Sequence, residues 1–428
     1  MVYFWQCALP GCAAATLSSI LHKTMANILF VPVPEFGHMI PPLKLAKALK
    51  LRRHRVYYVG FSDFEEYVRS QGLEYIPILE QRYPKGYMND RADKQFRMKL
   101  DRLSLISLEA REANDNIAFN PLEELEKEIA RVFQTVEPDL VIVDSMLRDL
   151  ALMAAHELGA PAVILSLHLE EARIGLGGPG YVPPELNLPV IVLCPKQIDF
   201  SPTPKNSNYY YLEASIDLER KEAHAFPWDA LDETKPLIYC SFGSQCHQYE
   251  QSEGLFRTII AALREKPGWQ LVLAIGPYLN IHDFQPAPEN VLIVSWAPQL
   301  EMLSRASMMI THGGLGAVKE CIFFGVPMIV FPGKWDQPNH AARVVYHGLG
   351  VRANIHDRSV RQIHSLIEAV DKNPMFKSRI AAMSETFREI ENSGIGVRTV
   401  EKLLADYRDK RKREIFARPR RTSQLLDG

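Results

Sequence analysis

The residues with the clearest chemistry lie in one run, between residues 294 and 339. Residues 307–311 are short and apolar, as expected for a buried parallel strand. His312 and two glycines connect this strand to a predicted helix over residues 315–324. The first turn of a helix presents free backbone N–H groups and the positive end of the helix dipole, so this turn is suited to bind an anion such as a phosphate. His312 adds a further hydrogen-bond donor beside it.

Four other side chains of the run suit the groups that accompany a phosphate in a nucleotide sugar. Trp296 offers a flat face for a base, and Glu320 can accept hydrogen bonds from a ribose diol. Asp336 and Gln337 follow the next predicted strand and suit several sugar hydroxyls. Each residue alone is also compatible with an ordinary βαβ corner that contains a hydrogen-bonded histidine. Their order along the chain favours a binding site.

A candidate general base follows the first predicted strand of the chain. His38 lies just after residues 27–33, and imidazole has a suitable unperturbed pKa for accepting a proton near neutrality. Asp144 ends a later apolar strand and can orient the imidazole and stabilise its cation. The alternatives are a loop or capping histidine and a helix N-cap aspartate. Glu35 is a competing base, ranked lower because an exposed loop glutamate is commonplace.

The elements that position these residues alternate between short apolar strands and helices. This rhythm predicts an α/β protein built from two doubly wound, Rossmann-like parallel sheets that face a central cleft. A chain of 428 residues is too long for one ordinary core. We expect a first domain at 25–225, a second domain, which carries the run from 294 to 339, at 226–407 and a basic disordered tail at 408–428. Residues 201–235, rich in proline, asparagine and charge, are predicted to be the linker.

Several local predictions complete this outline. Residues 63–71 are expected to form a helix with Asp63 as its N-cap. The charged segment 81–120 and the glycine-rich loop 174–184 are expected to be irregular. The final helix, residues 397–407, is expected to pack back on the first domain. Residues 1–24 lack the basic start that a signal peptide has. They are interpreted as a disordered extension before Met25.

Composition restricts the class of protein further. The formal net charge of −2 argues against a nucleic-acid-binding protein. No run of about 20 residues is apolar enough to span a bilayer. The six cysteines form no C-x-x-C pair and no Cys/His metal spacing, which is typical of a protein of the reducing cytoplasm.

The run beginning at Trp296-Ala297-Pro298-Gln299 resembles the donor-binding signature of the UDP-glycosyltransferases. The segment from Asp336 to Arg343 is most similar to the bacterial branch that includes macrolide and carotenoid enzymes. The resemblance covers residues 25–407 and implies the GT-B fold, in which the first domain, 25–225, binds the acceptor and the second, 226–407, binds the nucleotide-sugar donor. Plant members have Asn and Ser where this chain has Gly316 and Ala317, so backbone N–H groups must hold the phosphates alone. The donor-binding residues implied are Ser244, Trp296, Ala297, Gln299, His312, Gly313, Gly314, Gly316, Glu320, Asp336 and Gln337.

The resemblance also implies a mechanism. His38, with Pro41 three residues later, matches the family's catalytic Gly-His motif, and Asp144 matches its orienting aspartate. The implied reaction is inverting transfer from a UDP-sugar, by preference UDP-glucose, to a lipophilic small-molecule acceptor. No cofactor or metal is expected, because no Asp-x-Asp motif occurs, and the diphosphate charge then falls on the helix N-terminus, His312 and Ser244. A monomer or weak dimer is expected.

Three other functions compete with this hypothesis. A sugar-nucleotide epimerase shares the two-domain architecture but needs no acceptor pocket. A non-catalytic sugar-nucleotide-binding protein would not need both His38 and Asp144. A nicotinamide dehydrogenase would need a glycine fingerprint after the first strand, which is missing.

Overall fold

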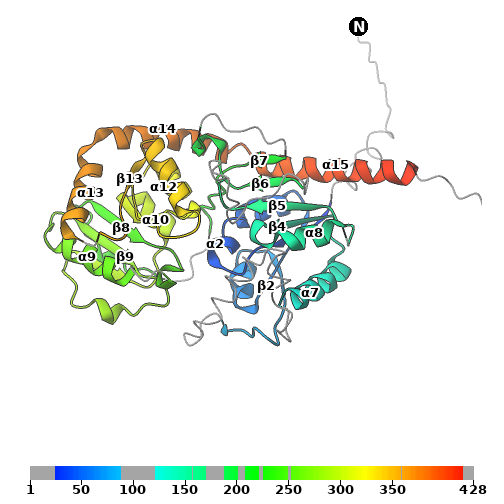
Figure 1. Ribbon diagram of the computed structural model, residues 1–428, viewed down its shortest axis with the longest axis horizontal. Coiled ribbons are helices and arrows are strands. Elements are labelled where there is room, and N and C mark those ends of the chain that lie inside the picture. The colour runs from blue at the N-terminus through cyan, green and yellow to red at the C-terminus, as the bar shows by residue number, and fades with distance from the viewer. Residues whose placement is uncertain are drawn as a thin grey trace, which may run out of the picture.

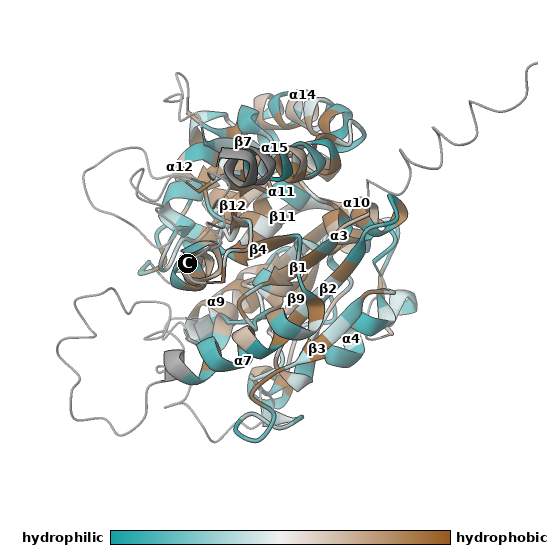
Figure 2. Ribbon diagram, turned by 90° about the vertical axis from the view of Figure 1, so that its right-hand side faces the viewer, coloured by the Kyte–Doolittle hydropathy of each residue, from teal (hydrophilic) through white to brown (hydrophobic). Residues whose placement is uncertain are grey.

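The chain folds into two lobes that lie side by side, each built on a parallel sheet (Figure 1). The computed structural model describes residues 25–87, 121–156, 158–169, 188–200, 208–220, 225–248, 252–357 and 359–417. Strand interiors are apolar, while polar residues concentrate on outward-facing helices such as α4 (Glu65–Ser70) and α7 (Pro121–Val136) (Figure 2). The prediction of two doubly wound parallel-sheet domains is therefore confirmed.

The first lobe contains seven strands in the order β3-β2-β1-β4-β5-β6-β7. Its strands are β1 (Asn27–Val31), β2 (Arg55–Gly60), β3 (Glu74–Pro77), β4 (Leu140–Asp144), β5 (Ala162–Ser166), β6 (Val190–Val192) and β7 (Tyr209–Tyr211). Every neighbouring pair is parallel, and all residues of β4 and β5 are buried. The helices that cover this sheet include α3 (Leu43–Leu51), α4, α7 and α8 (Arg148–His156).

The second lobe contains six strands in the order β10-β9-β8-β11-β12-β13. Its strands are β8 (Leu237–Ser241), β9 (Gln270–Ala274), β10 (Val291–Val294), β11 (Ala306–Thr311), β12 (Met328–Val330) and β13 (Gly350–Arg352). Its helices are α9 (Ser252–Arg264), α10 (Gln299–Arg305), α11 (Leu315–Phe324), α12 (Gln337–Tyr346), α13 (Val360–Lys372) and α14 (Pro374–Glu391). Both sheets reverse their strand order at the centre, where open α/β sheets bind ligands.

The last helix, α15 (Ile395–Ala417), leaves the second lobe and lies along the first (Figure 1). Val400, Leu403 and Leu404 join the apolar cluster that contains the α3 side chains. Tyr407 also donates a hydrogen bond to the carbonyl of Ala162, at 2.9 Å.

Three local predictions were wrong. Asp63 does not cap the helix, because its carboxylate accepts a hydrogen bond from the backbone N–H of Gly86 instead. The predicted linker, residues 201–235, contains strand β7 at the edge of the first sheet. The polar residues around its three tyrosines concealed this strand in the sequence. The predicted tail is helical as far as Ala417, since α15 continues without a break. Residues 1–24 and 418–428, most of 81–120 and all of 174–184 lie outside the described residues.

Buried charged groups join the two lobes. Arg343 of α12 donates to the Oδ1 atom of Asp199 through Nε at 3.0 Å and Nη2 at 2.7 Å, and both side chains are almost fully buried. Asp199 follows β6 in the first lobe, so this pair crosses the interface. Glu391, at the end of α14, accepts from the backbone N–H groups of Ser215 and Ile216. Such contacts fix how the two sheets face each other.

Replacement of Asp199 by Asn should destabilise the protein by about 3 kcal/mol, because it leaves the buried Arg343 cation without its counter-charge. The expected result is a lower urea midpoint of unfolding. The matched control is Glu368→Gln, which removes an exposed partner of Lys372 and should leave the midpoint almost unchanged. Equal midpoints for the two variants would contradict the assigned role of the Asp199–Arg343 pair.

Candidate active site between the two lobes

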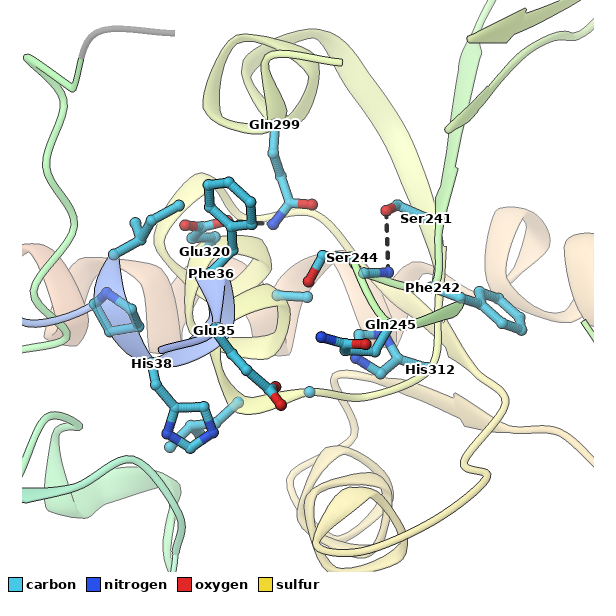
Figure 3. Close-up of a pocket in the computed structure, with 18 of the residues that line it drawn as sticks. Glu35, Phe36, His38, Ser241, Phe242, Ser244, Gln245, Gln299, His312 and Glu320 are labelled. Atoms are coloured by element: carbon cyan, nitrogen blue, oxygen red, sulfur yellow. Dashed lines mark hydrogen bonds between the residues drawn. The ribbon is translucent and has the colours of Figure 1, made fainter. Parts of the chain in front are cut away.

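A cavity of about 320 Å³ lies between the carboxyl ends of the two sheets. Figure 3 shows Glu35, Phe36 and His38 on one side and Ser244, Gln245 and His312 on the other. The structure brings almost all the sequence-predicted residues to its wall. Those that line it are His38, Ser244, Trp296, Ala297, Gln299, His312, Gly314, Gly316, Glu320, Asp336 and Gln337. Asp144 and Gly313 lie directly behind this wall, in contact with His38 and His340.

His38 and Asp144 form a hydrogen-bonded pair at the ends of two adjacent strands. Nδ1 of His38 lies 2.7 Å from Oδ2 of Asp144, and the aspartate is fully buried. The other oxygen of Asp144 accepts from the backbone N–H of Met146 at 2.9 Å. Asp144 therefore caps the short helix η3 (Ser145–Leu147) and orients the imidazole at the same time. Because strands β1 and β4 are parallel neighbours, their carboxyl ends must bring these residues together.

The charge on this pair is set by burial and by mutual attraction. Burial opposes protonation of His38, but Asp144, with smaller contributions from Glu35 and Asp336, raises the pKa of His38 to about 9. Burial alone would raise the pKa of Asp144, and the attraction of His38 holds that pKa below its usual range. The imidazole is therefore mainly protonated at neutral pH.

Two similar glycine turns face the cavity from the second lobe. Ser241, at the end of β8, accepts a hydrogen bond from the N–H of Gly243, and Thr311, at the end of β11, accepts one from the N–H of Gly313. Gly314 is the N-cap of α11 and has no side-chain cap, so the first N–H groups of that helix are available to a ligand. The turns thus present backbone N–H groups at the position where the sequence predicts an anion site.

The imidazole of His312 fills the space between these turns. A Cβ atom on Gly314 would lie 2.6 Å from Nε2 of His312, and one on Gly243 would lie 3.1 Å from Cε1. Burial lowers the pKa of His312 to about 4, against the opposing attraction of Asp336. His312 therefore faces the site as a neutral hydrogen-bonding group rather than as a cation.

The predicted ribose site is an interconnected set of polar groups. The amide of Gln299 donates to one oxygen of Glu320, as the dashed line in Figure 3 shows. The guanidinium of Arg220 lies 3.4 Å from the other oxygen. Nearby, the rings of Phe36 and Trp296 are 5.9 Å apart, so the first lobe covers the predicted base-binding tryptophan. Both oxygens of Glu320 are therefore already engaged.

Asp336 and Gln337, the predicted sugar-binding pair, have different surroundings. Asp336 contacts His168 of the first lobe, whose Nδ1 lies 2.5 Å from Oδ2 of Asp336. His340 lies 3.6 Å from the same oxygen. Burial opposes ionisation, but the two histidines hold the pKa of Asp336 far below its usual range. Gln337 is turned toward its own loop, where its side-chain oxygen accepts from the N–H groups of Gly333 and Lys334.

The sequence interpretation did not single out several residues of the cavity wall, among them His168, Arg220 and Phe36. His168 lies two residues beyond β5, so the rule that ligands bind at the carboxyl ends of strands would have identified it. Arg220 had no such signal, because it lies in the linker about which local sequence says little. Phe36 begins the short helix α2 (Phe36–Met39) that carries His38 and was overlooked beside it.

Comparison with known proteins agrees with this geometry. The profile of the family described as UDP-glucoronosyl and UDP-glucosyl transferase matches residues 176–390. NDP-glycosyltransferase YjiC of Bacillus subtilis is 26% identical over 398 residues, covering 85% of this chain and 93% of its own. Zeaxanthin glucosyltransferase of Pantoea ananas is 36% identical over 159 residues, covering 36% of this chain and 35% of its own. The spinosyn rhamnosyltransferase SpnG structure superposes with a TM-score of 0.67 at 19% identity, over 88% of this chain and all of that one.

The chain is thus a sugar-transferring enzyme with the GT-B fold. It belongs to the UDP-glucoronosyl and UDP-glucosyl transferase family, as the resemblance implied. None of the helices described above is long and apolar enough to cross a membrane.

Replacement of Gly314 by Ala should weaken UDP binding at least tenfold, about 1.4 kcal/mol. The new methyl group would meet the His312 ring at 2.6 Å and displace it from the predicted anion site. Gly268→Ala is the control, since a Cβ atom there meets nothing within 4 Å and the residue does not line the cavity. Isothermal titration with UDP measures both dissociation constants. An unchanged affinity in the Gly314 variant would show that this turn does not hold the diphosphate.

Proposed function

We propose that the protein transfers glucose from UDP-glucose to a hydroxyl group of a lipophilic small molecule, with inversion at the anomeric carbon. The observation that carries this proposal is the His38–Asp144 pair, which faces the uncapped N-terminus of α11 across one cavity. A base and an anion site on opposite walls are what direct displacement at a sugar carbon needs.

The reaction has one chemical step. The acceptor oxygen forms a bond to the anomeric carbon while its proton passes to His38 as general base. The bond from the anomeric carbon to the diphosphate oxygen breaks, and the electron pair leaves with UDP. Asp144 stabilises the imidazolium that forms, because its carboxylate is held 2.7 Å from Nδ1. A single displacement with no protein nucleophile accounts for inversion.

The leaving diphosphate is stabilised by fixed dipoles. The first N–H groups of α11 point toward the cavity, and Ser244 and neutral His312 offer further hydrogen bonds. No group of three carboxylate, histidine or cysteine side chains suited to a metal ion occurs within the described residues. We therefore assign the charge stabilisation to the protein itself.

The remaining assignments concern the two substrates. Trp296, covered by Phe36, is positioned to stack on uracil, and Glu320 to accept from the ribose hydroxyls. Asp336 supports a glucosyl donor, as the sequence resemblance implied. A lipophilic acceptor is supported by the relative that carries zeaxanthin in its name and by the apolar side chains Phe36, Ile40, Met146 and Leu167 in the cavity wall.

The test is UDP release from a panel of UDP-sugars with a mixed panel of lipophilic alcohols, followed by mass spectrometry of the products. We expect UDP-glucose to be the preferred donor and a chelator to leave the rate unchanged, because the helix dipole replaces the metal. A new epimer from UDP-sugar alone would instead support an epimerase, and tight UDP binding without turnover an accessory protein. Activity that a chelator abolishes and manganese restores would contradict metal-independent transfer.

The role of the catalytic pair predicts a pH dependence. Protonated His38 cannot accept the acceptor proton, so kcat/KM should rise about tenfold per pH unit and level off near pH 9. Asp144→Asn removes the charge that raises this pKa, so the rising limb should move to lower pH. The plateau should fall roughly a hundredfold or more, because the imidazolium is no longer stabilised.

The control for this experiment is UDP affinity, which both Asp144→Asn and His38→Ala should preserve, since both residues belong to the first lobe, across the cavity from the diphosphate turn. A rising limb at the same pH in the Asp144 variant, or full activity in the His38 variant, would exclude this pair as the catalytic base.

A further inference from the structure

We propose that His168 determines donor specificity, by hydrogen bonding through Nε2 to a hydroxyl of the transferred sugar. This inference rests on the proposed function and adds a contact from the first lobe to a sugar otherwise held by the second. His168 is neither part of the sequence run that binds the donor nor part of the His38–Asp144 pair.

The backbone fixes the position of His168 closely. It lies two residues beyond the end of β5, next to the end of β4 that carries Asp144. The hydroxyl of Ser166 donates to the carbonyl of His168 at 2.8 Å and accepts from its N–H at 3.3 Å. Two contacts to one hydroxyl hold this turn, so the imidazole projects from a rigid base into the cavity wall.

One ring nitrogen of His168 has a defined hydrogen-bond partner and a defined role as donor. Nδ1 lies 2.5 Å from Oδ2 of Asp336, whose pKa is well below its usual range because His340 and His168 offset its burial. An ionised carboxylate only accepts hydrogen bonds, so Nδ1 of His168 carries the proton and donates. Asp336 thereby sets the orientation of the ring.

The other ring nitrogen has no partner. Nε2 of His168 is buried and makes no hydrogen bond within the described part of the chain. A buried polar atom without a partner costs free energy, so each one in a native structure calls for an explanation. The side chain is 15% exposed and lines the cavity, so the missing partner is expected to be a substrate group.

The position of this nitrogen indicates that its hydrogen-bond partner is the sugar of the donor rather than the base or the diphosphate. The ring of His168 is bonded to Asp336 and its centroid is 5.8 Å from that of His38. In the proposed reaction the sugar is the group that lies between Asp336 and the catalytic base. A hydroxyl group donates to a bare imidazole nitrogen and accepts from a protonated one, so it matches Nε2 in either state.

His340 provides a contrast within the same structure. It also lies beside Asp336, but it is fully buried, donates through Nδ1 to the carbonyl of Gly313, and does not line the cavity. Its unpartnered Nε2 faces Asp336 at 3.6 Å rather than the ligand space. His340 therefore influences Asp336 without reaching a substrate.

The experiment measures kcat/KM for UDP-glucose and for its 2-, 3-, 4- and 6-deoxy analogues with the wild-type enzyme and His168→Asn. Asparagine reproduces the Nδ1 donor to Asp336 but has no atom at Nε2. We expect the wild type to discriminate against one analogue about tenfold more than the variant does, as for one lost hydrogen bond. The penalties at the other three positions should be the same in both enzymes.

Two further variants make the result specific. His168→Gln places a polar group near the Nε2 position and should recover part of the discrimination. His340→Asn, the matched control, should keep the wild-type pattern across the analogues even if it changes the overall rate. UDP affinity checks folding in every variant, because UDP lacks the sugar that His168 contacts.

The outcomes separate this inference from the proposed function. If the wild type transfers no sugar from any UDP donor, the proposed function fails. If the wild type is active but His168→Asn shows the wild-type penalty at each of the four deoxy positions, His168 does not contact the sugar and the inference is overturned. A change confined to the KM of the acceptor would overturn it as well, by assigning Nε2 to the other substrate.

Discussion

The chemistry of the cleft depends on two parallel sheets that keep their carboxyl ends face to face. Parallel strands collect their terminal residues at one edge, and each lobe supplies half of the cavity wall. Buried charges hold the lobes in register: Arg343 pairs with Asp199, and Lys319 of α11 donates to the carbonyl of Leu193 at 2.6 Å. A buried charge that loses its partner destabilises the protein, so these contacts resist sliding of one lobe against the other. Helix α11, which carries the proposed anion site, is itself bonded to the opposite lobe.

Within this frame, similar side chains acquire different properties from their surroundings. Two of the imidazoles that line the cavity differ in charge: Asp144 raises the pKa of His38 to about 9, whereas burial lowers that of His312 to about 4. The difference arises because His38 touches a carboxylate, whereas His312 lies between glycine turns. One histidine is thus suited to exchange a proton and the other to remain a neutral donor. Separation of roles by environment is a general feature of active sites that use several titratable groups.

The contiguous parts of this arrangement could be predicted from the sequence, and the parts assembled by folding could not. The run from Trp296 to Gln337 keeps its order along the chain, and local pattern was enough to place His312 between a strand and a helix. The partner of Asp336 is 168 residues away in His168, and that of Glu320 is 100 residues away in Arg220. No local pattern encodes such pairs. β7 was missed because three residues of an edge strand carry no periodic signal.

The state of Glu320 illustrates what tertiary contacts add to a motif. The motif supplies a carboxylate, but folding gives it Gln299 on one oxygen and Arg220 on the other. Such a carboxylate is held in one orientation before the ligand arrives, which lowers the entropy cost of binding. The Arg220 contact, at 3.4 Å, is long for a hydrogen bond and is the weaker of the two. In the proposed donor complex a ribose diol shares Glu320 with these partners, and the Arg220 contact is the one that it would weaken first.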